Sequence, residues 1–466
     1  MQAKPLGRLP RWARWSRLRT VSRKFAAISL RPDDLVGLID VVNVDLLLCC
    51  EGGDALEDVA EASGARVWCL ENELGRRRRW RNSHVEHLAR TSIADLLGST
   101  CIVPYAAATS LLSLEPATRI IAITPALKAI IDDKFLIRQM LAKAGVAVPT
   151  TVDLLLETGE FDRLARLLGC PFVVQPRTGS AGEGVVLVSN SEELANCTDP
   201  SRVPAMASSL EAMMTVNAHG VVLQDSVRVF PPTLQITGIA EFSASWGAYC
   251  GNDGFYDHRV DPDLQRTVRN SVTRLGHFLR SLGYRGVFGV DLAVGAAPDE
   301  VRVLEVNPRF QGSTWLVDRA LTRAGLQSIA STHLDAFEAD VSDVTQRRDP
   351  VGVSLEEGFV LLRASDQVRL SCSLDGGYKL VGDNGAQTLV SAAAGRSYDL
   401  ELRGSPSPGV VVEAGGTIAR AVSRRSLTIS TGRELSAHGA AVVQAAYSLI
   451  SAHKASLETD QGSTGR

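Results

Sequence analysis

The chain has 466 residues, enough for about two to four domains, and 45% of them are hydrophobic, as is usual for a globular protein. A net charge of −3 provides no overall field toward nucleic acid or a membrane, so neither is expected as a partner. No apolar run approaches the roughly 20 residues that span a bilayer. The eight cysteines form no Cys-x-x-Cys pair, which predicts reduced thiols in a cytoplasmic protein, without disulfides or a zinc site.

The first segment, residues 1–33, is predicted to be a basic arm. Its opening 25 residues contain no acid and lack the apolar core of a secretory signal. We interpret it as a solvated tail or a helix lying on the body, with an organelle transit peptide or a basic contact arm as alternatives. A second basic stretch, "GRRRRWR" at 75–81, is predicted to be a loop, or alternatively a rim that attracts an anionic ligand.

Residues 34–127 alternate short apolar runs with helical patterns such as "DALEDVAEASG". This alternation predicts an α/β domain with a mostly parallel sheet. The expected strands are "VVNVDLLLCC" (41–50), "ARVWCLE" (65–71), "CIVPYA" (101–106) and "RIIAITP" (119–125).

Residues 126–145, "ALKAIIDDKFLIRQMLAKAG", predict one strong amphipathic helix that ends at Gly145, with Pro149 just beyond. A strand, a helix and the hairpin "FVVQPRTGSAGEGVVLV" (172–188) are expected next, followed by a longer helical stretch and "GVVLQDSV". The bare glycines of the hairpin suggest backbone amides gathered around a phosphate. The loop has neither a P-loop ending nor the helix that follows a Rossmann fingerprint.

After about residue 340 the sequence pattern changes to short apolar runs separated by Gly, Pro, Ser and Asp. Residues 339–457 are therefore predicted to form a small β-rich domain closed by the helix "AHGAAVVQAAYSLISAHK", and 458–466 a flexible tail. The intervening residues 128–338 are expected to form one domain of two subdomains.

The segment Gly286–Thr314 predicts a hairpin that gathers oxygen ligands. Asp291 lies in its first strand and Glu305 in its second, and Asn307 shares a face with Glu305 because residues two apart on a strand do so. Two carboxylates and an amide oxygen suit a hard cation such as Mg²⁺. Arg309 extends the same face if the strand continues past Pro308. Alternatively, these acids are solvated residues at a strand edge and bind no ligand.

Four motifs in this order resemble the ATP-grasp superfamily of carboxylate–amine ligases. They are the helix "IDDKFLIRQMLAKAGVAVP", the loop "PFVVQPRTGSAGEGV", the hinge "VVLQDSV" and the metal signature "VDLAV…VRVLEVNPRFQGST". The resemblance covers roughly 124–330. It implies an α/β and α+β protein with the ATP-grasp fold, an N-terminal pre-ATP-grasp domain and a small β-rich C-terminal domain, using ATP and Mg²⁺, with two ions expected.

The resemblance also implies roles for individual residues. The nucleotide would be bound by the phosphate-contacting Lys134, by the loop and by the hinge, with two ions held by Asp291, Glu305 and Asn307. Arg309 would be catalytic, stabilising the acyl phosphate and the oxyanion. The implied nucleotide-binding residues are Lys134, Gln175, Arg177, Gly179, Ser180, Gly182, Gly184, Gln224, Asp225, Ser226 and Val227, and the substrate candidates are His258, Arg259, Gln311, Gly312 and Ser313.

Two positions depart from the family pattern. Gln175 stands where a lysine is usual, and Arg177, two residues on, is expected to restore the missing charge. Gln224 stands where a glutamate is common in the hinge. A charge-assisted hydrogen bond contributes about 1.5–3 kcal/mol against about 1 kcal/mol for a neutral one, so the exchange at Gln175 matters for phosphate binding.

Within the superfamily, "EVNPRFQGST" and the overall layout are most similar to pheganomycin-type peptide ligases of natural-product pathways. The expected reaction joins an activated amino-acid carboxylate to the amine of a peptide or amino acid, with release of ADP and phosphate. A homodimer is one expected assembly. The alternatives are a single L-amino-acid ligase, a biotin-carboxylase-like enzyme and a nucleotide-binding scaffold without catalysis.

Overall fold

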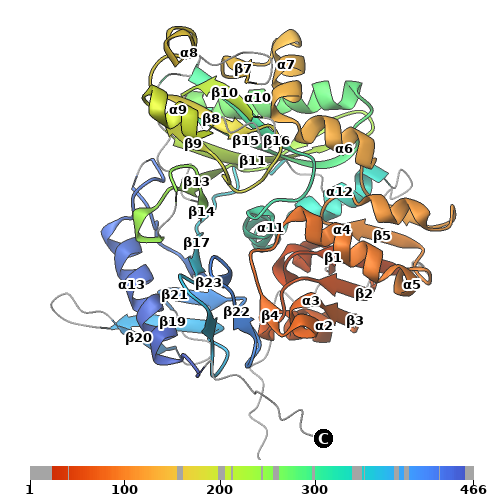
Figure 1. Ribbon diagram of the computed structural model, residues 1–466. Coiled ribbons are helices and arrows are strands. Elements are labelled where there is room, and N and C mark those ends of the chain that lie inside the picture. Colours follow the sequence, from red (N-terminus) through yellow and green to blue (C-terminus); the bar gives the residue numbers. More distant parts are fainter. Residues whose placement is uncertain are drawn as a thin grey trace, which may run out of the picture.

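The protein is described here from a computed structural model in which three parts surround a common centre (Figure 1). The N-terminal α/β domain lies to one side, the C-terminal β-rich domain to the other, and a small lid-like subdomain above them. The structure describes residues 24–39, 41–154, 161–197, 205–210, 214–242, 245–254, 262–295, 297, 300–337, 349–350, 352–381, 388–392, 398–429 and 431–456. Among these residues, no helix has the length and hydropathy required to cross a membrane.

The N-terminal domain is a five-stranded parallel sheet with the order β3-β2-β1-β5-β6, as the alternating pattern predicts. Its central strand β1 lies within the segment that was expected to be a basic arm, because the buried run "FAAIS" follows the basic residues directly. The strands are β1 (Phe25–Ser29), β2 (Val44–Cys49), β3 (Arg66–Cys69), β5 (Cys101–Pro104) and β6 (Arg119–Ile120). The helices are η2 (Pro32–Leu35), α1 (Val36–Ile39), α2 (Asp54–Ser63), α3 (Leu70–Leu74), α4 (Asn82–Thr91), α5 (Ile93–Leu96) and η3 (Thr109–Ser113).

The helix expected over 126–145 is two helices, α6 (Pro125–Asp132) and α7 (Lys134–Lys143). The break falls at Asp133, whose backbone is extended and whose side chain accepts a hydrogen bond from the amide of Leu136. An aspartate at this position is a good N-cap, which favours starting a new helix over continuing the old one. The break puts Lys134 at the first position of α7.

The small subdomain contains a four-stranded sheet with the order β7-β10-β8-β9. Its elements are β7 (Thr151–Asp153), α8 (Phe161–Leu168), β8 (Phe172–Pro176), β9 (Val186–Val188), α9 (Ser191–Cys197) and β10 (Ala205–Ser209). The predicted glycine hairpin is confirmed, since β8 and β9 pair antiparallel with Phe172 opposite Val188. The longer helical stretch expected after it is shorter, because "AMASS" forms β10 rather than helix.

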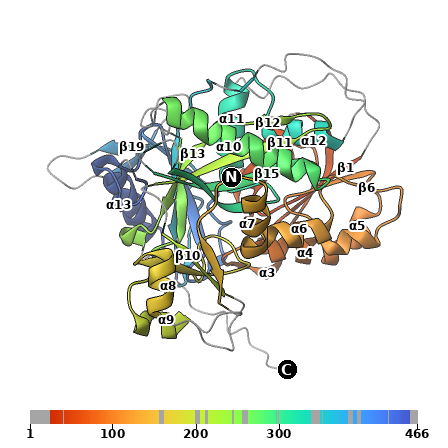
Figure 2. The ribbon, with the colours of Figure 1, turned by 90° about the horizontal axis from the view of Figure 1, so that it is seen from above.

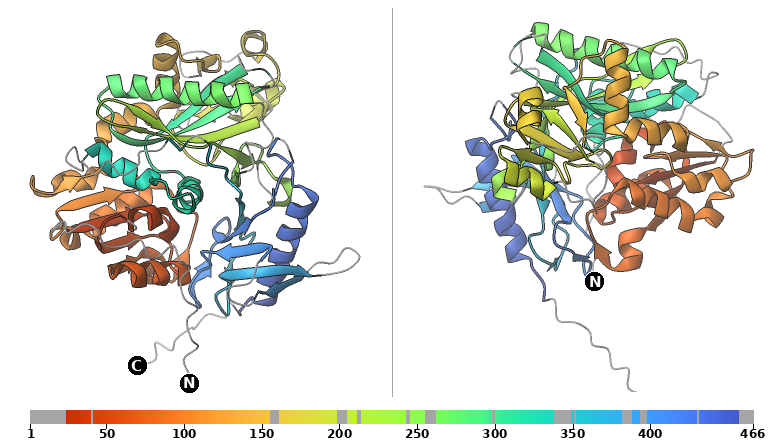
Figure 3. Two further views of the ribbon diagram at one scale, coloured as in Figure 1. Left: turned by 180° about the vertical axis from the view of Figure 1, so that it is seen from behind. Right: turned by 45° about the horizontal axis from the view of Figure 1, so that its top comes forward.

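An eleven-stranded sheet runs from the centre of the molecule into the C-terminal domain, in the order β16-β15-β11-β13-β14-β17-β23-β21-β19-β20 with β12 beside β11. Helix α10 crosses one face of the central strands (Figure 3). The central elements are β11 (Met214–Val222), β12 (Val227–Val229), β13 (Thr233–Thr237), η4 (Ala240–Phe242), β14 (Tyr249–Asp253), α10 (Pro262–Ser281), β15 (Gly286–Val294), β16 (Val301–Asn307), α11 (Thr314–Arg323) and α12 (Ile329–Phe337).

The C-terminal domain has the predicted short strands and closing helix, but its sheet is not separate, because β17 pairs with β14. A three-stranded sheet also joins it to the N-terminal domain through β4 (Arg76–Arg77). In Figure 2 the two domains lie on opposite sides of the central strands. The elements are β17 (Gly358–Arg363), β18 (Val368–Arg369), β19 (Gly376–Val381), β20 (Thr388–Ser391), β21 (Leu400–Arg403), β22 (Val411–Val412), β23 (Thr417–Ser423) and α13 (Ala437–Ala452).

Buried apolar residues form three large clusters that correspond to these parts. The first fills the N-terminal domain and extends into α11 and α12, which follow the metal signature directly. The second lies between α10 and the central strands, and the third under α13. Because burying apolar surface stabilises by about 25 cal/mol per Å², the first cluster fixes the start of α11 against the N-terminal domain.

Candidate functional site

The predicted oxygen ligands meet on two neighbouring antiparallel strands. Asp291 on β15 is directly opposite Glu305 on β16, and Asn307 is opposite Gly289. The Asn307 amide nitrogen lies 3.4 Å from an Asp291 carboxylate oxygen. The ladder shifts register just after Asp291, and such bulges re-aim side chains. The structure thus brings together all three residues that the sequence singled out.

The electrostatics of this centre favour a cation. Burial raises the pKa of Asp291 to about 6, and the charge of Glu305 acts in the same direction. Two carboxylates that face each other repel, and a divalent cation between them relieves that cost. Among the described residues, no group of three or more His, Cys, Asp and Glu could hold a metal. The third oxygen here belongs to an amide, and this donor set fits Mg²⁺.

Two further residues support Asp291, and sequence reasoning missed one of them. Asn217 on β11 is buried beside Asp291 and donates a hydrogen bond of 2.6 Å to its carboxylate. The Ser313 hydroxyl donates in turn to the Asn217 side-chain oxygen at 2.5 Å. Ser313 was a substrate candidate, and the structure places it behind the carboxylate. Asn217 carries no motif of its own, so only strand pairing reveals it.

Lys134 links the carboxylates to the glycine-rich loop. Its buried ammonium group lies 3.0 Å from a Glu305 carboxylate oxygen and donates to the Gly179 carbonyl, also at 3.0 Å. Arg138, one turn further along α7, is buried behind it and donates to the Leu304 carbonyl at 2.8 Å. Burial lowers the pKa of Arg138 to about 10. A lysine between a loop carbonyl and a carboxylate is poised to exchange either partner for a phosphate oxygen.

The glycine-rich loop (178–184) folds over the centre of the molecule. Its tip is Ala181, whose carbonyl accepts a hydrogen bond of 3.3 Å from the Tyr249 amide on β14. Gly182 has a φ of +72°, and a Cβ there would lie 1.8 Å from the Gly247 carbonyl oxygen. Only glycine allows this approach. Gly179, Ser180 and Gly184 belong to the same turn, so the structure brings the predicted loop residues together.

Gln175 and Arg177 lie at the start of this loop. The Arg177 guanidinium forms ion pairs with Asp133 at 2.6 Å and with Asp153 at 2.9 Å, and it stacks on the Phe135 ring. Two carboxylates therefore offset the charge that was expected to replace the lysine missing at Gln175. The ammonium group of Lys134 is a cation that contacts the loop directly, at the Gly179 carbonyl.

The predicted hinge is not brought to this site. Asn217 is the β11 residue beside Asp291, and β11 continues five residues past it to Val222, about 17 Å at the rise of a strand. Gln224, Asp225 and Ser226 follow in the turn to β12, and Val227 is the first residue of that strand. The Asp225 carbonyl accepts a hydrogen bond from Arg280.

The chain instead crosses from the small subdomain to the central sheet between β10 and β11. Within this crossing, residues 211–213 lie outside the described residues.

The remaining candidates border the N-terminal domain. Arg309 donates to the Asn307 side-chain oxygen at 2.8 Å and lies over the Tyr105 ring. A Cβ on Gly312 would lie 3.1 Å from the Tyr249 hydroxyl and 3.6 Å from an Arg31 nitrogen. Gln311 is buried and packs on Gly289. His258 and Arg259 lie outside the described residues.

Three side chains at this border were not found from the sequence. Arg31, Tyr249 and Arg363 belong to no sequence motif, and they come close only because three parts of the fold converge. Arg31 follows the carboxyl end of β1 and pairs with Glu51 at 3.6 Å. Ligands of parallel α/β sheets bind at that end of the strands, which is the one signal that could have indicated Arg31.

Comparison with known proteins finds a family match in the central part of the chain. Residues 131–313 match the ATP-grasp domain family. A curated relative, the formate-dependent phosphoribosylglycinamide formyltransferase of Corynebacterium glutamicum (strain R), is 30% identical over 191 residues. The match covers 38% of this chain and 41% of the relative. The chain therefore spans about two fifths of the length of the curated relatives that it matches.

Solved structures resemble nearly the whole chain. Carboxyaminoimidazole ribonucleotide synthase from Aspergillus clavatus, complexed with ATP, has a TM-score of 0.54 at 13% identity, covering 95% of this chain and all of that one. The biotin carboxylase domain of Hydrogenobacter thermophilus 2-oxoglutarate carboxylase, in complex with MgADP, ADP and bicarbonate, has a TM-score of 0.58 at 12% identity and covers 86% of each chain. At these identities the likeness concerns the fold.

Proposed function

We propose that this chain, which has the ATP-grasp fold, is an ATP-dependent ligase that joins a carboxylate to an amine and releases ADP and phosphate. The observation that carries the proposal is the position of Lys134, which bonds both the glycine-rich loop at Gly179 and the carboxylate of Glu305. One buried cation thus connects the element that covers phosphates with the element that would bind the metal. A nucleotide placed there would contact both.

The roles of the residues follow from their positions. Asp291, Glu305 and Asn307 would hold Mg²⁺, two ions by analogy with the family, which would neutralise charge on the transferring phosphoryl group. Lys134 and the amides of residues 178–184 would hold phosphate oxygens. No covalent nucleophile is required, because phosphoryl transfer depends mainly on positioning and charge neutralisation.

The chemical steps are balanced without further reagents. The substrate carboxylate attacks the terminal phosphorus of ATP, so that ADP leaves and an acyl phosphate forms. The amine then attacks the acyl carbon, the C–N bond forms, and phosphate departs with the electron pair of the C–O bond. The nitrogen loses one proton, which passes to the phosphate or to water. Arg309, held by the Asn307 side chain and beside Tyr105, is placed to stabilise the oxyanion of this second step.

For the substrates we propose an amino acid as the acid and a peptide or amino acid as the amine, in natural-product biosynthesis of the pheganomycin type. The support is the sequence form "EVNPRFQGST" together with a β-rich C-terminal domain that borders the site through Arg363 and Tyr249. A cytoplasmic location is proposed from eight cysteines that form no disulfide. A single-amino-acid ligase differs only in its acceptor, which the mass of the product distinguishes.

A second candidate is a ligase acting on bicarbonate or on a ribonucleotide-like amine. It is favoured by the similarity to the biotin carboxylase domain and to the synthase from Aspergillus clavatus. Release of ADP that depends on bicarbonate, without added amino acid, would support this candidate over the peptide ligase.

The proposed activity is tested by incubating purified protein with ATP, Mg²⁺ and pools of amino acids and peptides. We expect ADP to form only when substrate is present, together with a ligated product that is identified by mass. Glu305→Gln keeps the size of the side chain but removes the charge, and we expect it to abolish ADP formation. Formation of AMP, or full activity in Glu305→Gln, would contradict the proposal.

A further inference from the structure

Two arginines from different domains meet where the glycine-rich loop touches β14. Arg79, in the N-terminal domain just after β4, donates to the Ala181 carbonyl at 3.2 Å. Arg363, at the end of β17, donates to the Tyr249 carbonyl at 2.7 Å. Because the Tyr249 amide also bonds Ala181, the two guanidinium groups flank one backbone hydrogen bond. The folded loop therefore brings together charges that are far apart in the sequence.

Neither guanidinium has a carboxylate partner among the residues that the structure describes. Each is half-buried and donates its hydrogen bonds to main-chain carbonyl oxygens. Burial, with the nearby charges of Arg79 and Arg31, holds the pKa of Arg363 below its usual value. Half-buried like charges without counter-ions are costly, so an anionic group from beyond the described residues would stabilise this pair.

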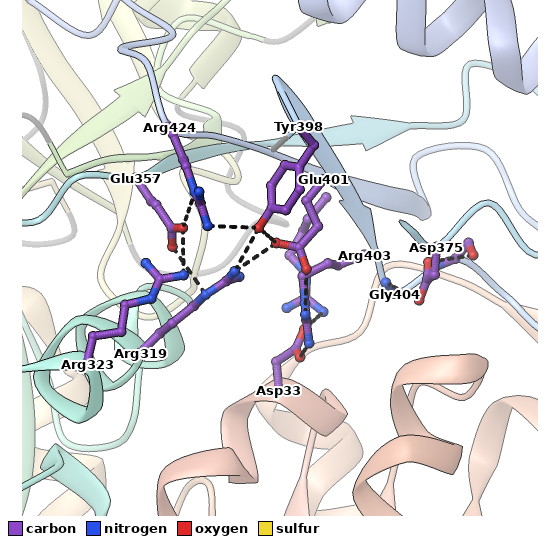
Figure 4. A network of polar contacts seen from close by, with 12 residues as sticks. Asp33, Arg319, Arg323, Glu357, Asp375, Tyr398, Glu401, Arg403, Gly404 and Arg424 are labelled. Carbon is purple, nitrogen blue, oxygen red and sulfur yellow. Dashed lines mark hydrogen bonds and ion pairs between the residues drawn. The ribbon is translucent and has the colours of Figure 1, made fainter. Parts of the chain in front are cut away.

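A second region of the same protein shows how this chain treats buried arginines elsewhere. In the polar network of Figure 4, Arg319 and Arg403 each contact the Glu401 carboxylate, at 2.9 and 2.8 Å. Arg403 also pairs with Asp33 at 2.6 Å. In this network the chain provides carboxylates for the arginines that join its parts. It provides none, among the described residues, for Arg79 and Arg363.

The arginine pair adjoins the proposed reaction centre. The Tyr249 ring points its hydroxyl to the neighbourhood of Gly312 and Arg31. Ser313, the next residue after Gly312, is the one that holds Asn217 against Asp291. Contacts through Tyr249, Gly312, Ser313 and Asn217 therefore connect Arg363 to Asp291, which places the arginine pair at the border of the proposed reaction centre.

We propose that Arg79 and Arg363 bind an anionic group of the second substrate, a carboxylate or phosphate distinct from the carboxylate that is activated. Guanidinium forks match both groups through paired hydrogen bonds. The inference rests on the proposed function in treating this anion as part of a substrate. Since Arg79 also holds the loop tip, binding of the anion and closure of the loop reinforce each other.

The experiment is a calorimetric titration of nucleotide-free protein with inorganic phosphate and, separately, with succinate. We expect the wild type to bind at least one of them, and Arg79→Met and Arg363→Met each to bind it about tenfold more weakly or worse, from loss of a charge-assisted pair. The matched control is Arg266→Met, which removes an exposed arginine of α10 and should bind like the wild type. Thermal unfolding of each variant checks that it is folded, and Arg79→Met tests the site from a different domain than Arg363→Met.

Further measurements distinguish which chemical group is bound and whether it belongs to a substrate or to the nucleotide. Preference for phosphate or for succinate assigns the chemical group. Binding that persists in protein saturated with MgADP supports a substrate site, whereas loss of binding with MgADP would assign the arginines to the nucleotide phosphates and overturn the proposal. Equal affinity in wild type and both variants, or no binding in the wild type, would also overturn it.

Glu305→Gln separates this inference from the proposed ligase activity. The variant should still bind the anion while forming no ADP. If Glu305→Gln remained active, the ligase mechanism would fail, yet the titrations of Arg79→Met and Arg363→Met would still decide whether the anion site exists.

Discussion

The interdomain network and the reaction centre use the same residue types in opposite ways. In the network, Asp33 receives Arg403 at 2.6 Å and Arg420 at 2.5 Å, so opposite charges are matched in the interior (Figure 4). At the centre, two carboxylates face each other, Lys134 pairs with Glu305, and the guanidinium groups of Arg309 and Arg363 donate to neutral oxygens. Matched charges hold parts of a protein in place, and unmatched charges mark the position of a ligand.

The contrast is sharpest within four consecutive arginines of the N-terminal domain. Arg77 is fully buried, pairs with the buried Glu71 at 2.6 Å and donates to the Gly404 carbonyl of the C-terminal domain. Arg79, two residues on, points instead to the loop tip. Within this stretch, Arg77 therefore joins the N-terminal and C-terminal domains, whereas Arg79 contacts the glycine-rich loop.

The largest expected effect follows from breaking the matched pair. Arg77→Met leaves the Glu71 carboxylate buried and unpaired, and we expect it to lower the free energy of unfolding by about 3–5 kcal/mol. Arg79→Met strands no carboxylate and should change that free energy by less than about 0.5 kcal/mol. Urea unfolding of both variants measures the difference. Equal destabilisation by Arg77→Met and Arg79→Met would contradict the view that Arg77 has a structural role and Arg79 does not.

Removing the cation that links loop and carboxylate should affect activity more than stability. We expect Lys134→Met to reduce the rate of ADP formation about 100-fold or more, by analogy with the loss of one preorganised donor to developing charge. Lys143→Met, at the exposed end of the same helix, is the control and should keep the wild-type rate. A Lys134→Met enzyme with normal turnover would remove Lys134 from the mechanism.

Closure of the loop can be blocked by a single methyl group. A Cβ on Gly182 would meet the Gly247 carbonyl oxygen, so we expect Gly182→Ala to raise the KM for ATP about tenfold through a mispositioned loop. Gly145→Ala has a similar positive φ but no atom within 4 Å of the added Cβ, and it controls for backbone strain. Similar KM values for the two variants would show that the contact at Gly247 is not needed.

The two regions should respond to pH with opposite signs. Burial alone would raise the pKa of Glu401, but Arg403 and Arg319 hold it at about 2, below its ordinary 4.5, so its contribution to stability is lost as pH falls through this window. The pKa of Asp291 is raised from 3.8 to about 6, so the folded state binds its proton more tightly and stability falls as pH rises from about 4 to 6.

Urea unfolding across pH 2 to 7 in the presence of a chelator measures both slopes. Glu401→Gln should remove the rising part and Asp291→Asn should reduce the falling part. An unchanged falling slope in Asp291→Asn would contradict the raised pKa of that carboxyl.

The smallest effect is expected at the rim of the loop. Arg81 pairs with Glu183 at 2.7 Å, but both side chains are 47% exposed, and such pairs contribute about 0–1 kcal/mol. Arg81→Ser should therefore change the KM for ATP less than about threefold, and the change should vanish at high salt. A larger, salt-independent change would give Arg81 a direct role at the site.

The sequence predicts this molecule best where the residues of a motif lie on paired strands or in one loop. Strand alternation and the hairpin positions of Asp291, Glu305 and Asn307 are enough to place them together. The hinge residues were taken from the motif "VVLQDSV", and the pairing of β11 with β15 carries that motif about 17 Å beyond Asn217. Strand pairing sets this separation, and the motif alone does not reveal it.

The arginines at the border of the site could not be predicted for a related reason. Arg31, Arg79 and Arg363 come from two domains separated by about three hundred residues of chain, and only the folded arrangement makes them neighbours. Arg177 shows the converse case. Its place in the sequence beside the loop suggested a phosphate contact, yet Asp133 and Asp153, from separate elements, take its charge.

The pairing of β14 with β17 has a consequence for how the chain can be divided. A fragment that ended before the C-terminal domain would leave the hydrogen-bonding groups of β14 open along one side. Unprotected strand edges recruit other strands, so such a fragment is expected to self-associate rather than to remain monomeric. The C-terminal domain thus covers the edge of the sheet that carries the candidate site, and we expect the two parts to fold together.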